Sequence, residues 1–348
     1  HYQHSEHSDL RLQEELDVIF QLGFSAYFLT VSTIVDNIKA KGIRVAARGS
    51  GAGSFVNYLL GISVLDPMEY GLLMERFLSP LRNSLPDIDI DVESHRRLEI
   101  YDDISELFGY QRVGAVAMFD TYRVRQAIRD VGRSLGIPTG EIGVFAKAFP
   151  RIRARSIREA LEEFPELRSS NISKLAKSGQ LNQMLNLVES LDGLPRHIAL
   201  HPCGVLISDA SFIDRIALQT SNQGFPLSQY GKEDVETLGL LKLDVLGIRM
   251  QSAMAYAVEE IYRTQARDID LDTIDFANSD TFELIQSTRT LGCFQIESPG
   301  QRELIGKFAP STFNDIIIDI SLFRPGPVKS DMITPFLEGR HGWKNISY

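Results

Sequence analysis

The feature that most constrains this 348-residue chain is the run from Pro86 to Asp91, which reads Pro-Asp-Ile-Asp-Ile-Asp. Side chains alternate between the two faces of a β-strand, so Asp87, Asp89 and Asp91 are predicted to share one face. Carboxylates crowded in this way repel one another, and burying them without a partner is costly. A divalent cation that prefers oxygen ligands, such as Mg²⁺, removes the conflict. The run therefore predicts a metal site on a strand.

A second acidic strand is predicted between Leu240 and Leu246, where Lys242 and Asp244 interrupt an apolar run. Their two-residue spacing places a cation and a carboxylate on one face, which a buried ion pair would also explain. Two acidic strands far apart in sequence are what a two-metal site for phosphoryl transfer requires, with the ions roughly 3.5–4 Å apart. We therefore predict that Asp244 joins the carboxylates of the first run around two Mg²⁺ ions. A solvated acidic strand is the alternative, and the interspersed isoleucines disfavour it.

A glycine-rich segment from Arg48 to Ser54 reads Arg-Gly-Ser-Gly-Ala-Gly-Ser. Glycines let backbone N–H groups converge on an anion, and a helix predicted over 55–60 would add its positive N-terminal end. The segment matches neither the Walker loop nor GxGxxG. A structural turn is the alternative, but Arg48 and Ser50 would supply a charge and a hydroxyl to a triphosphate.

The distribution of charge along the chain says more about a nucleic-acid partner than the net charge does. The net charge of −10 argues against a nucleic-acid partner, yet residues 111–158 carry ten basic residues and three acidic ones. A local basic block matters more for binding phosphate than the charge of the whole chain. The block predicts phosphate contacts, with a solvated basic face as the alternative.

His201, in Leu-His-Pro-Cys-Gly, is a candidate general base, although a lone histidine beside a strand is more often a structural donor. Cys203 and Cys293 form no CxxC pair, which predicts a reducing cytoplasm and no disulfide. No apolar stretch approaches the ~20 residues of a membrane span, and no signal peptide is evident. Because the chain begins with His1 rather than Met, we expect a fragment of a longer protein.

Strand and helix patterns alternate along the chain and predict an α+β fold with a basic helical insertion between the two acidic strands. A helix over 94–108 has Ser94 as its predicted N-cap. Beyond Arg249 the pattern is mainly helical. The other predicted helices are 10–22, 27–40, 72–78, 122–135, 157–164 and 175–191, and the other predicted strands are 43–45, 113–119 and 204–208.

Together these motifs resemble the bacterial C-family replicative DNA polymerases, the alpha subunits of DNA polymerase III. The similar segments recur in family order along nearly the whole chain. They are Arg48–Ser54, Glu75–Leu78, Pro86–Asp91, Arg129–Arg133, Lys242–Gly247, Phe294–Ser298 and Phe323–Pro327.

The resemblance implies a polymerase-beta-like nucleotidyltransferase palm, a mixed sheet with helices, formed by residues 1–118 and 200–249. A helical thumb would be inserted at 119–199. Residues 250–348 would begin a mainly helical fingers domain that is incomplete here.

The implied activity is template-directed DNA synthesis, in which nucleotidyl groups pass from dNTP to a primer 3′-OH with two Mg²⁺ ions. Asp87, Asp89 and Asp244 would bind metal and act with Lys242 in catalysis, and Asp91 would assist. The implied partners are primer–template DNA and, for the full-length chain, a sliding clamp and other replisome subunits including a 3′–5′ exonuclease, in the bacterial cytoplasm at the nucleoid. Nucleotide would be bound by Arg48, Gly49, Ser50 and Arg76, and DNA by Arg123, Arg125, Arg129, Arg151, Arg153 and Arg155.

Three departures from the family pattern leave open whether the chain belongs to the main replicase or to an error-prone paralogue. Gly231 follows Gln229-Tyr230 where the family often has an acidic residue, paired glycines after a histidine are replaced by Pro202-Cys203-Gly204, and Val92 replaces a usual Phe. None removes a predicted metal ligand. The paralogue would act in repair and damage tolerance. Two further alternatives do not depend on these departures: a metal-dependent nuclease, which would not need the glycine-rich segment, and a scaffold with an inactive palm, which would be expected to lack a ligand.

Overall fold

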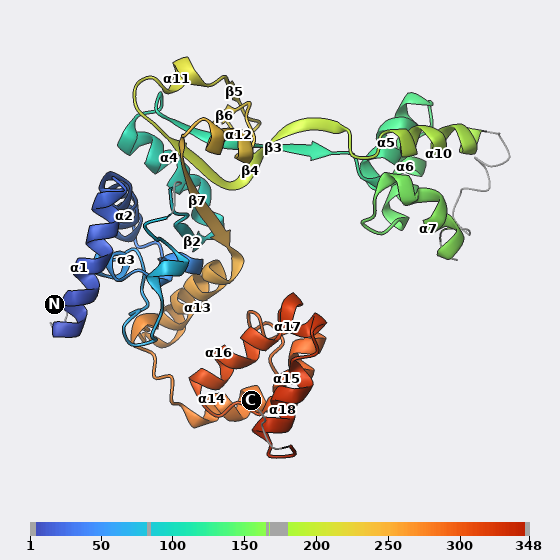
Figure 1. The fold of residues 1–348 in the computed structure, drawn as a ribbon. Helices are drawn as coiled ribbons and strands as arrows, with labels where there is room; N and C mark the ends of the chain where they lie inside the picture. Colours follow the sequence, from blue (N-terminus) through green and yellow to red (C-terminus); the bar gives the residue numbers. More distant parts are fainter. Residues whose placement is uncertain (1–4, 82–84, 165–166, 168–179, 345–348) are drawn as a thin grey trace. The chain divides into compact units, whose positions relative to one another are not determined.

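The computed structural model describes residues 5–81, 85–164, 167 and 180–344, and it divides into two compact units, His1–Ser252 and Ala253–Tyr348 (Figure 1). The first unit combines a mixed sheet with helices, and the second is helical in its described part. The predicted α+β class is therefore confirmed.

One seven-stranded sheet organises the first unit, in the order β1-β2-β7-β4-β3-β6-β5. The two acidic strands, β2 and β7, are parallel neighbours, although about 150 residues separate them in the sequence. β1 and β4 flank this pair, and both run antiparallel to it. The strands are β1 (Val45–Arg48), β2 (Asp89–Glu93), β3 (Val113–Thr121), β4 (Pro195–Ile207), β5 (Leu218–Thr220), β6 (Pro226–Ser228) and β7 (Leu241–Ile248).

Helices α1 (Glu6–Gln21), α2 (Ser25–Ala40) and α4 (Arg97–Phe108) share one apolar core with the sheet. Ile88 and Ile90 are buried in this core, so the face of the acidic run opposite the carboxylates is covered as predicted. In the described part of the chain no single helix is long and apolar enough to span a membrane, and α1 and α2 pass that test only as a pair bent by 112°.

Two local predictions in this unit are corrected. Ser94 does not cap α4, because it begins a 3-10 turn, η3 (Ser94–Arg96), and α4 starts after Arg96 without a side-chain cap. The segment predicted as a helix over 72–78 holds only the 3-10 turn η2 (Met74–Arg76). The remaining short elements are η1 (Gly49–Gly53), α3 (Phe55–Leu59), α11 (Phe212–Arg215) and α12 (Lys232–Thr237).

β3 and β4 continue beyond the sheet as a two-stranded ribbon that leads into a helical lobe (Figure 1). Both strands are longer than predicted because they form this ribbon. The lobe has its own core, which includes Ile128, Phe145, Phe149 and Val188. Residues 175–179 of the predicted helix 175–191 lie outside the described residues. The lobe consists of α5 (Val124–Ser134), α6 (Thr139–Ala148), η4 (Ala154–Ser156), α7 (Ile157–Glu163) and α10 (Gln180–Ser190).

The second unit begins within α13 (Arg249–Gln265). Its core is formed by Leu304, Phe308, Leu322 and Leu337. The helices that follow α13 are short and mostly begin at side-chain caps, as with Ser298 and Thr312. They are η5 (Leu271–Thr273), α14 (Ser279–Gln286), α15 (Pro299–Phe308), α16 (Phe313–Leu322), α17 (Pro325–Lys329) and α18 (Ile333–Arg340).

A buried carboxyl group makes the stability of the second unit depend on pH. Asp319 is 1% exposed, its Oδ2 accepts a hydrogen bond from Gln301, and its Oδ1 has no hydrogen-bond partner among the described residues. Burial raises the pKa of Asp319 to about 6, although the Gln301 bond opposes the shift. A raised carboxyl pKa means that the fold favours the neutral form of Asp319. The contribution of Asp319 to the stability of this unit is therefore complete below the unfolded pKa near 3.8 and is lost as pH rises through about 6.

We therefore expect Asp319→Asn to flatten the pH dependence between pH 4 and 6.5, because asparagine stays neutral. At pH 7 the variant should be more stable than the parent by up to ~3 kcal/mol, at 1.36 kcal/mol per pKa unit. Urea unfolding followed through Trp343, the single tryptophan of the chain and part of this unit, measures the effect. Parallel pH profiles for parent and variant would contradict the assignment.

Candidate active site

The two predicted acidic strands meet at one point of the sheet. Asp89 on β2 lies in register with Asp244 on β7, and Arg48 on β1 lies opposite Asp89 on the other side. Three charged residues therefore form a row across three neighbouring strands. This row is built from segments near residues 48, 89 and 244, and only the fold brings them together.

The electrostatics of Asp89 reflect this crowding of acids. Burial raises the pKa of Asp89, the charges of Asp244 and Asp87 raise it further, and Arg48 and Lys242 oppose the rise. Half-buried carboxylates that repel one another are stabilised by a cation, and carboxylate oxygens are the ligands that Mg²⁺ takes. The donors around Asp89 and Asp244 thus fit a hard divalent ion.

Lys242 is the cation nearest to Asp244. Its Nζ lies 2.6 Å from Oδ2 of Asp244 and 3.9 Å from Oδ1 of Asp87, and its side chain is 5% exposed. Burial lowers the pKa of Lys242, but the hydrogen bond and charge of Asp244 and the charge of Asp87 outweigh it, so the pKa is raised. Lys242 is therefore charged and links the two carboxylates.

Asp87 and Asp91 lie at the margins of the row. β2 begins at Asp89, so Asp87 precedes the strand, and its side chain is 57% exposed. Asp91 is opposite the apolar Leu246, and its Oδ1 lies 3.2 Å from Nε of Arg48. Burial raises the pKa of Asp91, and Arg48 opposes this. Asp89 and Asp244 are thus the paired carboxylates, with Asp91 turned toward Arg48.

The glycine-rich segment lies against the same row. Gly49 has φ +71°, a left-handed conformation that glycine adopts without strain, and a Cβ placed there would be 3.8 Å from Oδ2 of Asp89. Ser50 is exposed in η1, and Arg76 is exposed on η2, which packs against η1. The residues predicted to bind nucleotide therefore lie on β1 and two neighbouring turns, and Arg48 and Gly49 are the ones beside Asp89.

The N-terminus of the following helix, which was predicted to support phosphate binding, has a partner within the chain. The N-terminus of α3 already holds an anion of the protein itself, the carboxylate of Glu15 from α1, which is fully buried. This carboxylate also accepts a bond from Arg11 Nε at 2.7 Å. Its other donors are Ser54 Oγ at 2.8 Å, Phe55 N at 2.9 Å and Val56 N at 3.1 Å.

Tyr27 was not predicted as a site residue. The backbone N–H of Ile88 donates to its hydroxyl at 3.1 Å, which fixes the chain between Asp87 and Asp89. Burial raises the pKa of Tyr27, and the nearby carboxylates raise it further, so the hydroxyl is neutral at pH 7. The sequence gives no signal for this role, because Tyr27 reads as one more apolar position of α2.

A bulge in β4 brings two further side chains to Asp244. Ala117 pairs with Leu200 and Ala115 with Val205, so the four residues 201–204 lie opposite Val116 alone. A Cβ at Gly204 would lie 2.7 Å from Val116 Cγ2, which explains the glycine.

Inside this bulge, the Nδ1 atom of His201 acts as a hydrogen-bond acceptor. Its Nδ1 accepts from the N–H of Gly204 at 3.0 Å and of Cys203 at 3.4 Å. Burial lowers the pKa of His201. The Sγ of Cys203 donates to Oδ1 of Asp244 at 3.6 Å, and burial, followed by the charge of Asp244, raises the pKa of the thiol to about 11.

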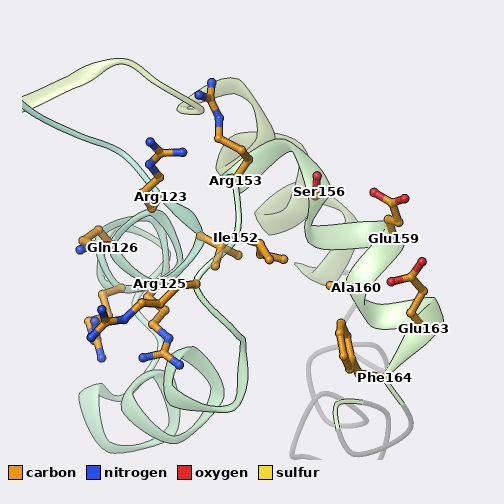
Figure 2. A pocket seen from close by; sticks show the side chains of 13 residues that line it. Arg123, Arg125, Gln126, Ile152, Arg153, Ser156, Glu159, Ala160, Glu163 and Phe164 are labelled. Atoms are coloured by element: carbon orange, nitrogen blue, oxygen red, sulfur yellow. The ribbon is translucent and has the colours of Figure 1, made fainter. Parts of the chain in front are cut away.

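The helical lobe contains a cavity of about 930 Å³ (Figure 2). Arg123 and Arg125 lie on its α5 side, and Glu159 and Glu163 lie on its α7 side. The two glutamates were not predicted as residues of the DNA-binding surface. Five of the six arginines predicted to bind DNA line the cavity, namely Arg123, Arg125, Arg129, Arg151 and Arg153.

These arginines differ in how far they are already engaged. Arg153 makes a two-point ion pair with Asp192, and Arg125 Nε donates to the carbonyl of Phe149 at 2.7 Å. Arg155 does not line the cavity, and its Nε lies 3.9 Å from Asp192. Among the described residues, Arg123 and Arg151 have no carboxylate within ion-pair distance, so they are available to an anionic ligand.

Carboxylates side by side on neighbouring strands are typical of enzymes that transfer phosphoryl groups with metal ions. Residues 2–247 match the family described as the bacterial DNA polymerase III alpha NTPase domain, and residues 250–348 match the bacterial DNA polymerase III alpha subunit finger domain. The chain therefore belongs to the bacterial DNA polymerase III alpha subunit family, which confirms the resemblance found in the sequence.

Curated relatives match almost the whole chain. The DNA polymerase III subunit alpha of Buchnera aphidicola is 38% identical over 344 residues, 97% of this chain and 29% of the relative. The subunit alpha of Bacillus subtilis and an error-prone DNA polymerase of Symbiobacterium thermophilum are each 37% identical over 339 residues, covering 97% of this chain and 30% of each relative. The chain thus spans about three tenths of the length of these relatives.

Proposed function

We propose that this chain carries the catalytic carboxylates of a template-directed DNA polymerase, which transfers nucleotidyl groups from dNTP to a primer 3′-OH in bacterial chromosome replication. The observation that carries the proposal is the register of Asp89 with Asp244 on parallel strands. Family membership supports the reaction, because the relatives are named DNA polymerases.

In this proposal Asp87, Asp89 and Asp244 hold two Mg²⁺ ions. When bound there, Mg²⁺ would stabilise the charge on the attacking and leaving oxygens of an in-line displacement. Lys242 holds Asp244 through Oδ2 and keeps it oriented toward β2. Arg48, Gly49, Ser50 and Arg76 grip the triphosphate, for which the left-handed turn at Gly49 beside Asp89 is the supporting observation.

We infer a polymerase-beta-like palm from residues 1–118 and 200–249, a thumb from 119–199 and the start of the fingers from 250–348. The helical lobe inserted between β3 and β4 supports the thumb, and the structural division after Ser252 supports the fingers. The complete polymerase would also bind a sliding clamp and other replisome subunits at the bacterial nucleoid.

Two other functions remain testable rivals. A role as an error-prone polymerase rests on the relative of that name, which is as similar to this chain as the DNA polymerase III subunit alpha of Bacillus subtilis is. A metal-dependent nuclease would also need paired carboxylates but not the loop beside Asp89. Products from primed DNA, dNTP and Mg²⁺ separate a polymerase from a nuclease: the proposal requires a longer primer and is overturned if the only products are shorter strands. The error frequency of the extended strands separates the replicative from the error-prone polymerase.

The arginine-lined cavity is the proposed contact to the DNA backbone. We expect Arg123→Glu combined with Arg151→Glu to weaken duplex binding and flatten its salt dependence. Each lost phosphate contact lowers the slope of log affinity against log salt by roughly 0.9, so the pair should lower it by about 2. Fluorescence anisotropy of a labelled primer–template between 50 and 300 mM salt measures the slope.

The matched control is Arg133→Glu combined with Lys147→Glu, which makes the same change in charge on exposed residues of the lobe that do not line the cavity. If the control lowers the slope as much as the cavity pair, the effect is one of net charge. If neither double variant alters the slope, Arg123 and Arg151 belong to a solvated surface that does not contact the DNA.

A further inference from the structure

A cluster of softer ligands lies beside the paired carboxylates. The bulge of β4 places His201 and Cys203 next to Asp244, and ligand atoms of the three residues lie within 4.8 Å of one another. In the described part of the chain this is the one grouping of three such side chains at that spacing. We propose that His201, Cys203 and Asp244 form a binding site for a soft divalent cation of the Zn²⁺ or Cd²⁺ type.

The distances fit a tetrahedral ion. With bonds of ~2.3 Å to sulfur and ~2.0–2.2 Å to nitrogen or oxygen, tetrahedral Zn²⁺ holds its sulfur about 3.5 Å from each of the other donors. The Sγ of Cys203 lies 3.5 Å from Nδ1 of His201 and 3.6 Å from Oδ1 of Asp244. The two distances from sulfur thus match those around one tetrahedral ion, and the third pair of donors lies within 4.8 Å.

The donor types determine which ion binds. Mg²⁺ takes oxygen ligands, whereas thiolate and imidazole favour Zn²⁺ and related ions. The ion takes the place of the proton between Cys203 and Asp244, and this proton passes to solvent. At His201 the ion displaces the N–H groups of Gly204 and Cys203 from Nδ1. Lys242 remains on Oδ2 of Asp244, because the ion uses Oδ1.

Occupation of this site has a consequence for catalysis that rests on the proposed function. Asp244 is a proposed Mg²⁺ ligand, so an ion held by Cys203 and Asp244 competes with Mg²⁺ for that carboxylate. Zn²⁺ should therefore inhibit primer extension in competition with Mg²⁺. Three protein ligands leave one position open, which a phosphate oxygen of a bound nucleotide could fill.

The test uses Cd²⁺ added to this chain without DNA or dNTP, and it follows the ultraviolet charge-transfer band of Cd²⁺–thiolate. The chain has two cysteines, so Cys293→Ser, which removes the exposed cysteine of the second unit, is the matched control. We expect the band in the parent and in Cys293→Ser, with one thiolate per ion, and we expect Zn²⁺ to displace Cd²⁺ at far lower concentration than Mg²⁺ does, because thiolate and imidazole favour the softer ions. In Cys203→Ser we expect the band to disappear, with at least the ~10-fold loss of affinity that follows even from removing outer ligand partners.

The proposal is overturned if Cys293→Ser shows no band, or if a folded Cys203→Ser keeps it. The first outcome needs no variant at the site, so it holds even if Cys203→Ser fails to fold. In a polymerase that carries this chain, Zn²⁺ should inhibit Cys203→Ser at least ~10-fold less potently than the parent, relative to the Mg²⁺-supported rate of each. A band without any polymerase activity would reject the proposed function and leave the ion site standing.

Discussion

Asp244→Asn is expected to abolish primer extension by a polymerase that carries this chain, while affinity for primer–template DNA changes little. Asp244 lies in register with Asp89 and is held by Lys242, so the substitution removes a charged ligand without emptying space in the sheet. Stabilisation by metal supplies several kcal/mol of barrier lowering, so turnover should fall by at least ~10³-fold. Single-turnover extension at saturating dNTP, with anisotropy for DNA affinity, measures both quantities.

Asp91→Asn is the matched control for this prediction. Asp91 belongs to the same acidic run as Asp89, but it is turned to Arg48 and lies opposite Leu246. We expect Asp89→Asn to resemble Asp244→Asn and Asp91→Asn to cost much less. An Asp244→Asn enzyme that keeps more than a tenth of its turnover has lost only ~1.4 kcal/mol, which would remove Asp244 from the metal site.

The acidic strands were predictable from the sequence because their signal is local. Alternation fixed which side chains of the run face the core, and Ile88 and Ile90 are buried as predicted. Crowded carboxylates are stabilised by a cation, and a two-metal site requires a second acidic strand. Asp244 could therefore be predicted to join the same site before the sheet order was known. The start of the strand could not be predicted, because pairing begins at Asp89 and depends on the partners that β1 and β7 offer.

The residues missed by sequence analysis act through distant contacts. The bulge that brings Cys203 to Asp244 exists only because four residues of β4 lie opposite one residue of β3. Tyr27 contacts the acidic run through a backbone N–H, which carries no sequence signal. Glu15 reads as an ordinary helical glutamate, and only the fold reveals the donors that surround it. A side chain whose partners are backbone groups far away in sequence leaves no pattern to detect.

Glu15→Ala is expected to lower the free energy of unfolding of the first unit by ~3–5 kcal/mol. Removing one partner of a buried charged network leaves the others uncompensated. Here the substitution removes the carboxylate that accepts from Arg11, from the hydroxyl of Ser54 and from the first N–H groups of α3. Urea unfolding followed by far-ultraviolet circular dichroism measures the loss, with Trp343 reporting separately on the second unit.

Glu14→Ala makes the same chemical change one position earlier on α1, where the side chain is exposed, and should stay within ~0.5 kcal/mol of the parent. The comparison also decides how the glycine-rich segment binds phosphate. If Glu15→Ala costs as little as Glu14→Ala, Glu15 is not needed at the N-terminus of α3, and that N-terminus is open to a triphosphate as the sequence suggested. If the cost is large, Glu15 permanently occupies the helix end, and phosphate must be gripped by Arg48, Ser50 and the turn at Gly49 instead.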